Sequence, residues 1–339
     1  MAKELQIRKI YLSDHQVNTI YFGGGTPSLM SEAELAELMG TIAREYRVAP
    51  EAEVTLEANP DDITEKKLSI WKQYGINRLS IGIQSFHDPH LSYLHRAHDA
   101  AHAKRCVQMA QQAGFQNLTI DLIYGIPADS HAIWERDVAE ALALGVPHIS
   151  AYCLTIEPQT VFGNWLKKKK IRAVDDDFAA VQFDHLVEQL GRAGLEQYEV
   201  SNFARPEWHS RHNSAYWFQI PYLGVGPGAH SYNGQSRQAN VPNNALYVKA
   251  IGQGQIPAEV EILGREDHIN EYLLTTLRTK WGTDLALLKD RYGYDLEHEK
   301  SSVIARFQRA EWLYQQEGKL FLTQAGKLLA DTITSELFV

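Results

Sequence analysis

The stretch YFGGGTPSLMSEAEL, residues 21–35, decides the fold because it joins an apolar run to a helix start through three glycines. The run VNTIYF (17–22) predicts a buried strand, and Ser31 followed by Glu34 is the capping-box pattern that begins a helix. Strand, turn and helix in this order make one βα unit. Glycines at 23–25 suit either a tight turn or the close approach of a ligand to the main chain.

The same unit recurs through residues 17–200, where short runs rich in Ile, Val, Leu and Tyr alternate with helical patterns. The predicted strands are 17–22, 53–58, 76–83, 117–125, 148–156 and 196–200. The glycines that mark the ends of the helices between them are Gly75, Gly114, Gly145 and Gly194. So regular a repeat predicts a parallel sheet, open or rolled toward a barrel.

The chain changes character after residue 200. Residues 201–260 are dense in aromatic residues, His, Gly and Pro with little periodicity, which indicates a connecting segment of functional interest. Residues 261–339 predict a small, mostly helical, winged-helix-like domain with one short strand at KLFLT (319–323). We therefore expect three parts, with the barrel in 1–200.

The composition restricts the possible partners. A net charge of −9 argues against nucleic acid, and no apolar run approaches the length of a membrane helix. The first residues, MAKELQIRKIYL, predict an amphipathic helix without a secretory signal, so we expect a cytoplasmic protein. The two cysteines, Cys106 and Cys153, exclude a disulfide framework and are better interpreted as small buried hydrophobic residues.

Polar side chains follow each predicted strand, at the sheet edge where such folds bind ligands. The main candidates are Glu57, Gln84, Asp121 and Thr155 after strands two to five, together with Arg96 further along. Backbone groups freed by glycine, two carboxylates, an amide and a guanidinium suit a zwitterionic ligand that carries hydroxyl groups.

Each candidate also has a structural interpretation. The glycines can serve only a turn, and the Glu57 and Asp121 carboxylates can cap the following helices. Gln84 can satisfy loop backbone, and Arg96 can be a solvated surface charge. The sequence alone leaves these alternatives open.

Several long motifs occur in an order typical of one family. They are YFGGGTPSLM, EANPDDIT, INRLSIGIQSFHDPHLSYLHRAHD, NLTIDLIYGIP, HISAYCLTIEPQT and RHNSAYWFQIPYLGVGPGAHSY. Over nearly the whole chain they resemble the oxygen-independent coproporphyrinogen III oxidase-like family of radical S-adenosylmethionine (SAM) proteins. Within that family, HNSAYW resembles the haem chaperone branch rather than the oxidases.

The resemblance implies a partial (β/α)6 TIM-like barrel that binds S-adenosylmethionine beside a [4Fe–4S] cluster. Gly24, Gly25 and Thr26 match the glycine motif against the methionine end, and Thr155 matches the adenine side. The positions that match the nucleotide pocket are Glu57, Gln84, Arg96 and Asp121.

The chain departs from the family at the cluster. The family holds the cluster with a CxxxCxxC loop after its first strand, which these 339 residues do not contain. We therefore expect that the first strand and the cluster ligands are missing, through truncation or in a natural form without a cluster. Cys106 and Cys153 lie on separate predicted elements and do not replace three ligands.

The segment WHSRHNSAYW (208–217) carries the haem prediction. His212 and His209 are candidate axial ligands, because neutral imidazole binds haem iron, with His230 a further candidate. The structural alternative is a packed aromatic loop whose histidine side chains form hydrogen bonds with backbone groups.

The sequence is compatible with three functions. The first is a haem chaperone that passes haem to acceptor haemoproteins, with peripheral contact to membrane haemoproteins and a dimer as open alternatives. The second is oxidative decarboxylation of coproporphyrinogen III, for which a chain without the cluster loop is expected to be inactive. The third is a barrel that binds a phosphorylated metabolite at GGGTPS.

Overall fold

The computed structural model describes residues 1–13 and 16–339, which fold into two compact units. Unit 1 comprises Met1–Ile20, Ser31–Glu53 and Ser210–Val339, and unit 2 comprises Tyr21–Met30 and Val54–His209. Strands β1 (Gln16–Phe22) and β2 (Arg47–Ala58) begin in unit 1 and end in unit 2.

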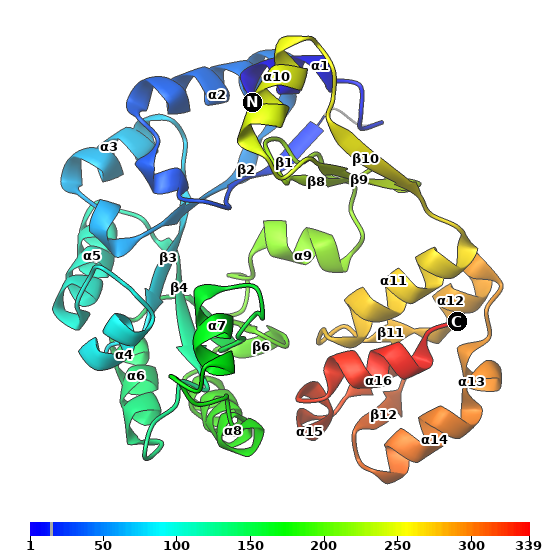
Figure 1. The fold of residues 1–339 in the computed structure, drawn as a ribbon. Helices are drawn as coiled ribbons and strands as arrows, with labels where there is room; N and C mark the ends of the chain where they lie inside the picture. Colours follow the sequence, from blue (N-terminus) through cyan, green and yellow to red (C-terminus); the bar gives the residue numbers. More distant parts are fainter. Residues whose placement is uncertain (14–15) are drawn as a thin grey trace. The chain divides into compact units, whose positions relative to one another are not determined.

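The main sheet has seven strands in the order β1-β2-β3-β4-β5-β7-β6 (Figure 1). The pairs β2–β3, β3–β4 and β4–β5 are parallel, whereas β7 pairs antiparallel with both β5 and β6. The strands not yet located are β3 (Arg78–Gln84), β4 (Asn117–Tyr124), β5 (His148–Cys153), β6 (Glu196–Glu199) and β7 (Asn202–Ala204). The predicted parallel order is confirmed, but the antiparallel end of the sheet was not predicted because β7 has only three residues.

Helices connect the parallel strands of unit 2, as parallel pairing requires. They are α3 (Glu65–Gln73), α4 (Asp88–Tyr93), α5 (Ala100–Gln112), α6 (Ala132–Ala143), α7 (Val161–Lys167) and α8 (Asp176–Arg192). Helices α3, α5 and α6 lie along the outer side of β3 and β4 (Figure 1). Their buried residues Leu68, Val107 and Val138 lie on this packed side, and the predicted glycines end four of the helices with left-handed φ angles.

Unit 1 holds the ends of the chain. Its helices are α1 (Ala2–Ile7), α2 (Glu32–Glu45), α9 (Arg211–Trp217), α10 (Asn244–Gly252), α11 (Arg265–Leu277), α12 (Leu285–Tyr292), α13 (Leu296–Glu299), α14 (Ser301–Arg309), α15 (Gln324–Lys327) and α16 (Ala330–Leu337). Its own strands are β8 (His230–Tyr232), β9 (Ser236–Asn240), β10 (Ala258–Ile262), β11 (Thr283–Asp284), β12 (Leu313–Gln316) and β13 (Lys319–Leu322). The predicted capping box begins α2, where the Ser31 hydroxyl accepts from the Glu34 N–H at 3.3 Å.

Two small antiparallel sheets correct the sequence analysis. Strands β10-β9-β8 form a sheet between residues 230 and 262, where the sequence lacked clear periodicity because β8 has three residues and β9 and β10 have five each. In the C-terminal part, the predicted strand at 319–323 is β13, and it pairs with β11 and β12. Of the helices in the described part of the chain, none is long and apolar enough to cross a membrane.

A buried carboxylate joins α1 to the segment that carries β8 to β10. Glu4 is fully buried and accepts hydrogen bonds from the Gly226 N–H at 2.9 Å, the Asn240 amide at 2.7 Å and the Tyr247 hydroxyl. Arg8, one turn later, lies 3.3 Å from the same carboxylate. Three buried donors therefore depend on one acceptor.

Replacing Glu4 by Ala is expected to lower the free energy of unfolding by roughly 3 kcal/mol, because it leaves buried donors and Arg8 without their acceptor. Chemical denaturation followed by circular dichroism measures this change. The matched control is Glu37→Ala on the exposed face of α2, for which we expect a change under about 0.5 kcal/mol. Equal losses in the two variants would contradict the assignment.

Candidate functional site

One carboxylate ties the glycine turn of unit 2 to its neighbouring strand. The Gly24 N–H donates to Glu57 Oε2 at 3.1 Å, and the Tyr21 hydroxyl donates to Glu57 Oε1 at 2.6 Å. Gly24 and Gly25 have φ angles of +71° and +57°, and a Cβ added to either would meet no atom within 4 Å. A Cβ on Gly23 would lie 2.3 Å from the Tyr21 ring. Packing therefore requires the first glycine, whereas the next two leave their main chain open.

Asp121 lies beside Glu57 on the same sheet. The Ser80 hydroxyl donates to Asp121 at 3.3 Å, and burial together with the negative charge of Glu57 raises the pKa of Asp121 to about 7. Burial and the same charge also raise the pKa of Tyr21. Neither carboxylate caps the following helix, because the N-cap residues of α3 and α6 are Thr64 and His131. The capping alternative for Glu57 and Asp121 is wrong.

Gln84 and Arg96 both approach Gly82. A Cβ on Gly82 would lie 2.8 Å from Gln84 Nε2 and 4.0 Å from Arg96 Nη2. Arg96 donates to Asn59 Oδ1 at 3.4 Å, and burial lowers its pKa against the opposing charges of Asp121 and Asp61. Arg96 is therefore half-buried and interacts electrostatically with Asp121. This contradicts the alternative that Arg96 is a solvated surface charge.

Gln84 is the last residue of β3 and has a left-handed φ of +71°. The sequence analysis missed Asp137, which binds the two residues that follow Gln84. Asp137 of α6 is buried and accepts from the Phe86 N–H at 2.8 Å and from the Ser85 hydroxyl. Burial raises the pKa of Asp137, and these hydrogen bonds oppose the rise. The available signal was an acid on the apolar face of its helix, between Trp134 and Val138.

The two threonines of the predicted site are placed differently. Thr26 is half-buried and precedes a short 3-10 turn, Pro27–Leu29, without capping it through its side chain. Thr155 is exposed after β5, and its hydroxyl donates to the Cys153 carbonyl at 3.4 Å. The contacts that join Glu57, Gln84, Arg96 and Asp121 do not include Thr155.

His212 is held on both sides within unit 1. Its Nδ1 lies 2.9 Å from Thr19 Oγ1 of β1, and its Nε2 lies 3.0 Å from the Tyr216 hydroxyl one turn later on α9. Burial lowers the pKa of His212 to about 4, so the imidazole is neutral at pH 7. The helix itself is fixed by buried Glu53 of β2, which accepts from the N–H groups of Arg211 at 3.1 Å and His212 at 2.9 Å.

His209 belongs to unit 2 and has other partners. Its Nε2 lies 2.8 Å from Glu196 Oε1, and its ring centroid lies 4.5 Å from that of Tyr198. His230 begins β8 with an exposed side chain.

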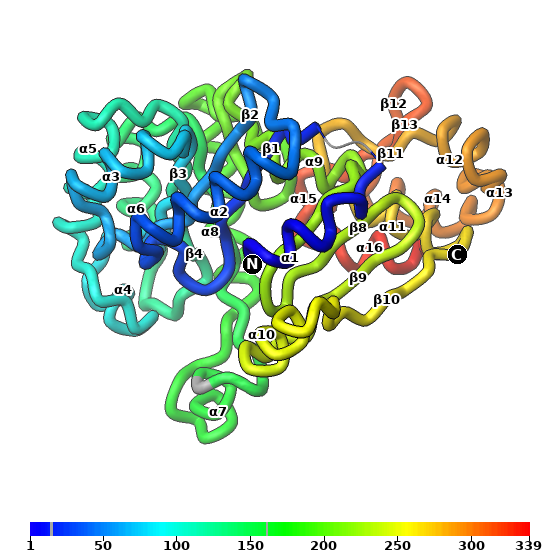
Figure 2. Tube along the Cα trace, turned by 90° about the horizontal axis from the view of Figure 1, so that it is seen from above, coloured from blue at the N-terminus to red at the C-terminus, as the bar shows by residue number. Residues whose placement is uncertain are grey.

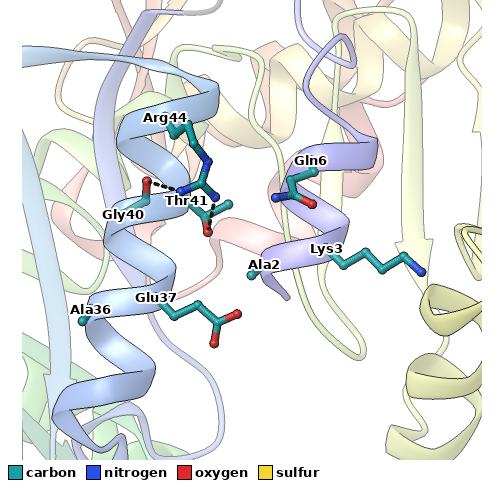
Figure 3. Close-up of a pocket in the computed structure, with 8 residues that line it drawn as sticks. All are labelled: Ala2, Lys3, Gln6, Ala36, Glu37, Gly40, Thr41 and Arg44. Carbon is teal, nitrogen blue, oxygen red and sulfur yellow. Dashed lines mark hydrogen bonds between the residues drawn. The ribbon is translucent and has the colours of Figure 1, made fainter.

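A cavity of about 410 Å³ lies between α1 and α2 in unit 1 (Figure 3). Ala2, Ala36 and Gly40 line it together with longer polar side chains, and the Arg44 guanidinium turns back onto Gly40 and Thr41 (Figure 3). None of the predicted site residues lines this cavity.

The cysteines do not form a metal site with other residues. Cys106 is buried in α5, where burial raises its pKa to about 12, and Cys153 is half-buried at the end of β5. Within residues 1–13 and 16–339, no three His, Cys, Asp or Glu side chains are grouped so that they could hold a metal ion.

Two family models match the chain. Residues 4–140 match the radical SAM superfamily, and residues 263–329 match the HemN C-terminal domain.

Among curated relatives, the Heme chaperone HemW of Bacillus subtilis is 33% identical over 94% of this chain and 84% of the relative. The Heme chaperone HemW of Mycobacterium tuberculosis H37Rv is 34% identical over 99% of this chain and 85% of the relative. Among solved structures, coproporphyrinogen III oxidase (HemN) from Escherichia coli aligns with a TM-score of 0.82 at 20% identity, covering all of this chain and 82% of the oxidase. The predicted fold class, a partial barrel with a small C-terminal domain, is confirmed.

The raised pKa of Asp121 predicts how stability depends on pH. The folded protein keeps this proton up to about pH 7, whereas an unfolded Asp loses it near pH 4, so stability falls as pH rises from about 4.5 to 7. Asp121→Asn removes this titrating group. Between pH 4.5 and 7 we expect the free energy of unfolding of the variant to decrease by about 2 kcal/mol less than that of the wild type. Urea denaturation at several pH values measures both slopes, and equal slopes would refute the assignment.

Proposed function

Because the chain belongs to the haem chaperone (HemW) branch of the radical SAM superfamily, we propose that it binds haem and passes it to acceptor haemoproteins in the cytoplasm. The observation that carries the proposal is His212, a neutral imidazole in the HNSAYW segment whose ring is oriented by Thr19. In the tautomer in which Nδ1–H donates to the Thr19 hydroxyl, the unprotonated Nε2 can bind iron.

The surroundings of His212 suit a porphyrin. Tyr216 of the same segment and Phe218, which directly follows it, expose 37% and 52% of their surface, and the Phe218 ring centroid lies 4.7 Å from that of Trp281. Exposed aromatic rings provide apolar contact area for a flat macrocycle. In this proposal iron replaces the Tyr216 hydroxyl as the partner of Nε2, and His209, held by Glu196, is the weaker ligand candidate.

We also propose that S-adenosylmethionine binds in unit 2 at the open glycine turn. The main chain of Gly24 and Gly25, next to Thr26, would receive the methionine end, and Thr155 would lie on the adenine side. The side chains proposed to line the nucleotide are Glu57, Gln84, Arg96 and Asp121. When bound, this cofactor would supply a sulfonium nucleoside. Among the described residues, no three His, Cys, Asp or Glu side chains are grouped so that they could hold a metal ion.

The enzyme alternative has less support. The likeness to the E. coli oxidase, at 20% identity, concerns the fold alone, whereas the chaperone relatives match at 33% and 34%. Protoporphyrinogen formation by the protein under anaerobic conditions would favour the oxidase.

Haem titration tests the chaperone proposal. We expect a Soret band with the wild-type protein and at least about tenfold weaker binding for His212→Ala, which loses the iron ligand. Tyr216→Phe should retain binding, because it removes only the competing partner of Nε2.

The matched control for His212→Ala is His298→Ala, whose side chain is 82% exposed and which should bind like wild type. A wild-type protein that causes no spectral change in haem ends the chaperone proposal. Loss of binding in both histidine variants would remove His212 from it.

Calorimetric titration with S-adenosylmethionine tests the second site. Arg96→Gln should weaken binding at least about tenfold, because it removes a half-buried charge that can hold a carboxylate. Arg105→Gln, on the exposed side of α5, should bind like wild type. Unchanged affinity in Arg96→Gln would exclude that residue from the site.

A further inference from the structure

A run of five cations directly follows the core of helix α7 in unit 2. We call it the basic tip, and it consists of Lys167, Lys168, Lys169, Lys170 and Arg172. All five side chains are exposed. No ion pair or side-chain hydrogen bond joins them to any residue among those the structure describes.

The basic tip contrasts with the rest of the chain. The whole chain carries −9, so the remainder without these five positive charges carries −14. Like charges collected on one segment repel one another, and no ion pair with a described residue offsets this repulsion. Such a cluster has no evident structural purpose and indicates an anionic partner.

Helix α7 is attached through its apolar side. The Phe162 ring lies 5.3 Å from that of Tyr93 and 5.8 Å from that of His95, and the Trp165 ring lies 5.3 Å from that of His95. The aromatic side chains therefore face the loop after α4. Figure 2 shows α7 beyond the other helices of unit 2, and the five cations lie on the last residue of α7 and on the segment directly after it.

We infer that the basic tip docks the protein on the surface of an anionic phospholipid bilayer. Four of the five cations are lysines, which act as point charges and lack the planar fork with which Arg recognises a particular carboxylate or phosphate. A membrane surface with spread negative charge attracts cations without requiring a particular hydrogen-bond geometry. An acidic protein partner would ask for both.

The projection makes this docking feasible for an acidic protein. Each cation near an anionic leaflet contributes about 1 kcal/mol, and the attraction fades within a Debye length of about 8 Å. The tip can bring five cations into that layer, and residues 167–177 keep a net charge of +2 when Asp175, Asp176 and Asp177 are counted. Since the aromatic side chains of α7 are already packed, the binding is electrostatic, reversible and sensitive to salt.

Vesicle sedimentation with the full chain tests the inference. We expect binding to phosphatidylcholine vesicles that contain roughly a third phosphatidylglycerol, no binding to pure phosphatidylcholine, and release at about 1 M salt. The combined substitution Lys168→Gln, Lys169→Gln, Lys170→Gln should weaken binding at least about tenfold. All three side chains are exposed, so circular dichroism should show an intact fold.

The control changes the net charge equally elsewhere. Lys9→Gln, Lys66→Gln, Lys249→Gln replaces three other exposed lysines and should bind vesicles like wild type. Wild-type protein that ignores anionic vesicles, or a control that loses binding as much as the tip variant, overturns the inference. Tip-dependent binding to polyglutamate without vesicle binding would instead assign the surface to an acidic protein. Haem binding plays no part in this test, so its outcome is independent of the chaperone proposal.

Discussion

The hydrogen bonds that Glu57 accepts are the constraint on which the candidate site depends. The Glu57 carboxylate binds the end of β1 through the Tyr21 hydroxyl and the glycine turn through the Gly24 N–H. Glu57 can do this only because β2 brings its C-terminal end to the same sheet edge as β1. The turn therefore keeps an open main chain at Gly24 and Gly25 without a ligand to support it. A site prepared in this way loses less entropy on binding.

Acidic side chains perform the same task elsewhere in each unit. Glu4 accepts from the Gly226 N–H, Glu53 from two N–H groups at the start of α9, and Asp137 from the Phe86 N–H. In each case a buried carboxylate satisfies main-chain donors that lie in a loop or in the first turn of a helix. Backbone groups left without partners would be costly to bury. The chain can thus carry functional side chains on loops while the loops stay ordered.

This arrangement explains what the sequence could predict. Glu57 and Asp121 were recognisable because each is a polar residue in the C-terminal half of a buried strand, and parallel strands must bring such ends together. The supporting carboxylates were not, since Glu53 and His212 are 159 residues apart and Glu4 and Gly226 are 222 apart. Pattern within one segment reports which side is buried, not which distant group it meets. Asp137 was the exception that the helical pattern could have shown.

The two partners of His212 bear on how a chaperone would release its cargo. An imidazole bound to iron through Nε2 gives up the Tyr216 hydroxyl, and on release it regains that hydrogen bond. Because Thr19 holds Nδ1 in both situations, the ring need not rotate for the exchange. If haem binds His212 as proposed, the internal hydrogen bond would offset part of the free energy lost with the iron bond, which would lower affinity and favour transfer. A site that stored haem permanently would have no reason to keep such a competitor one turn away on the same helix.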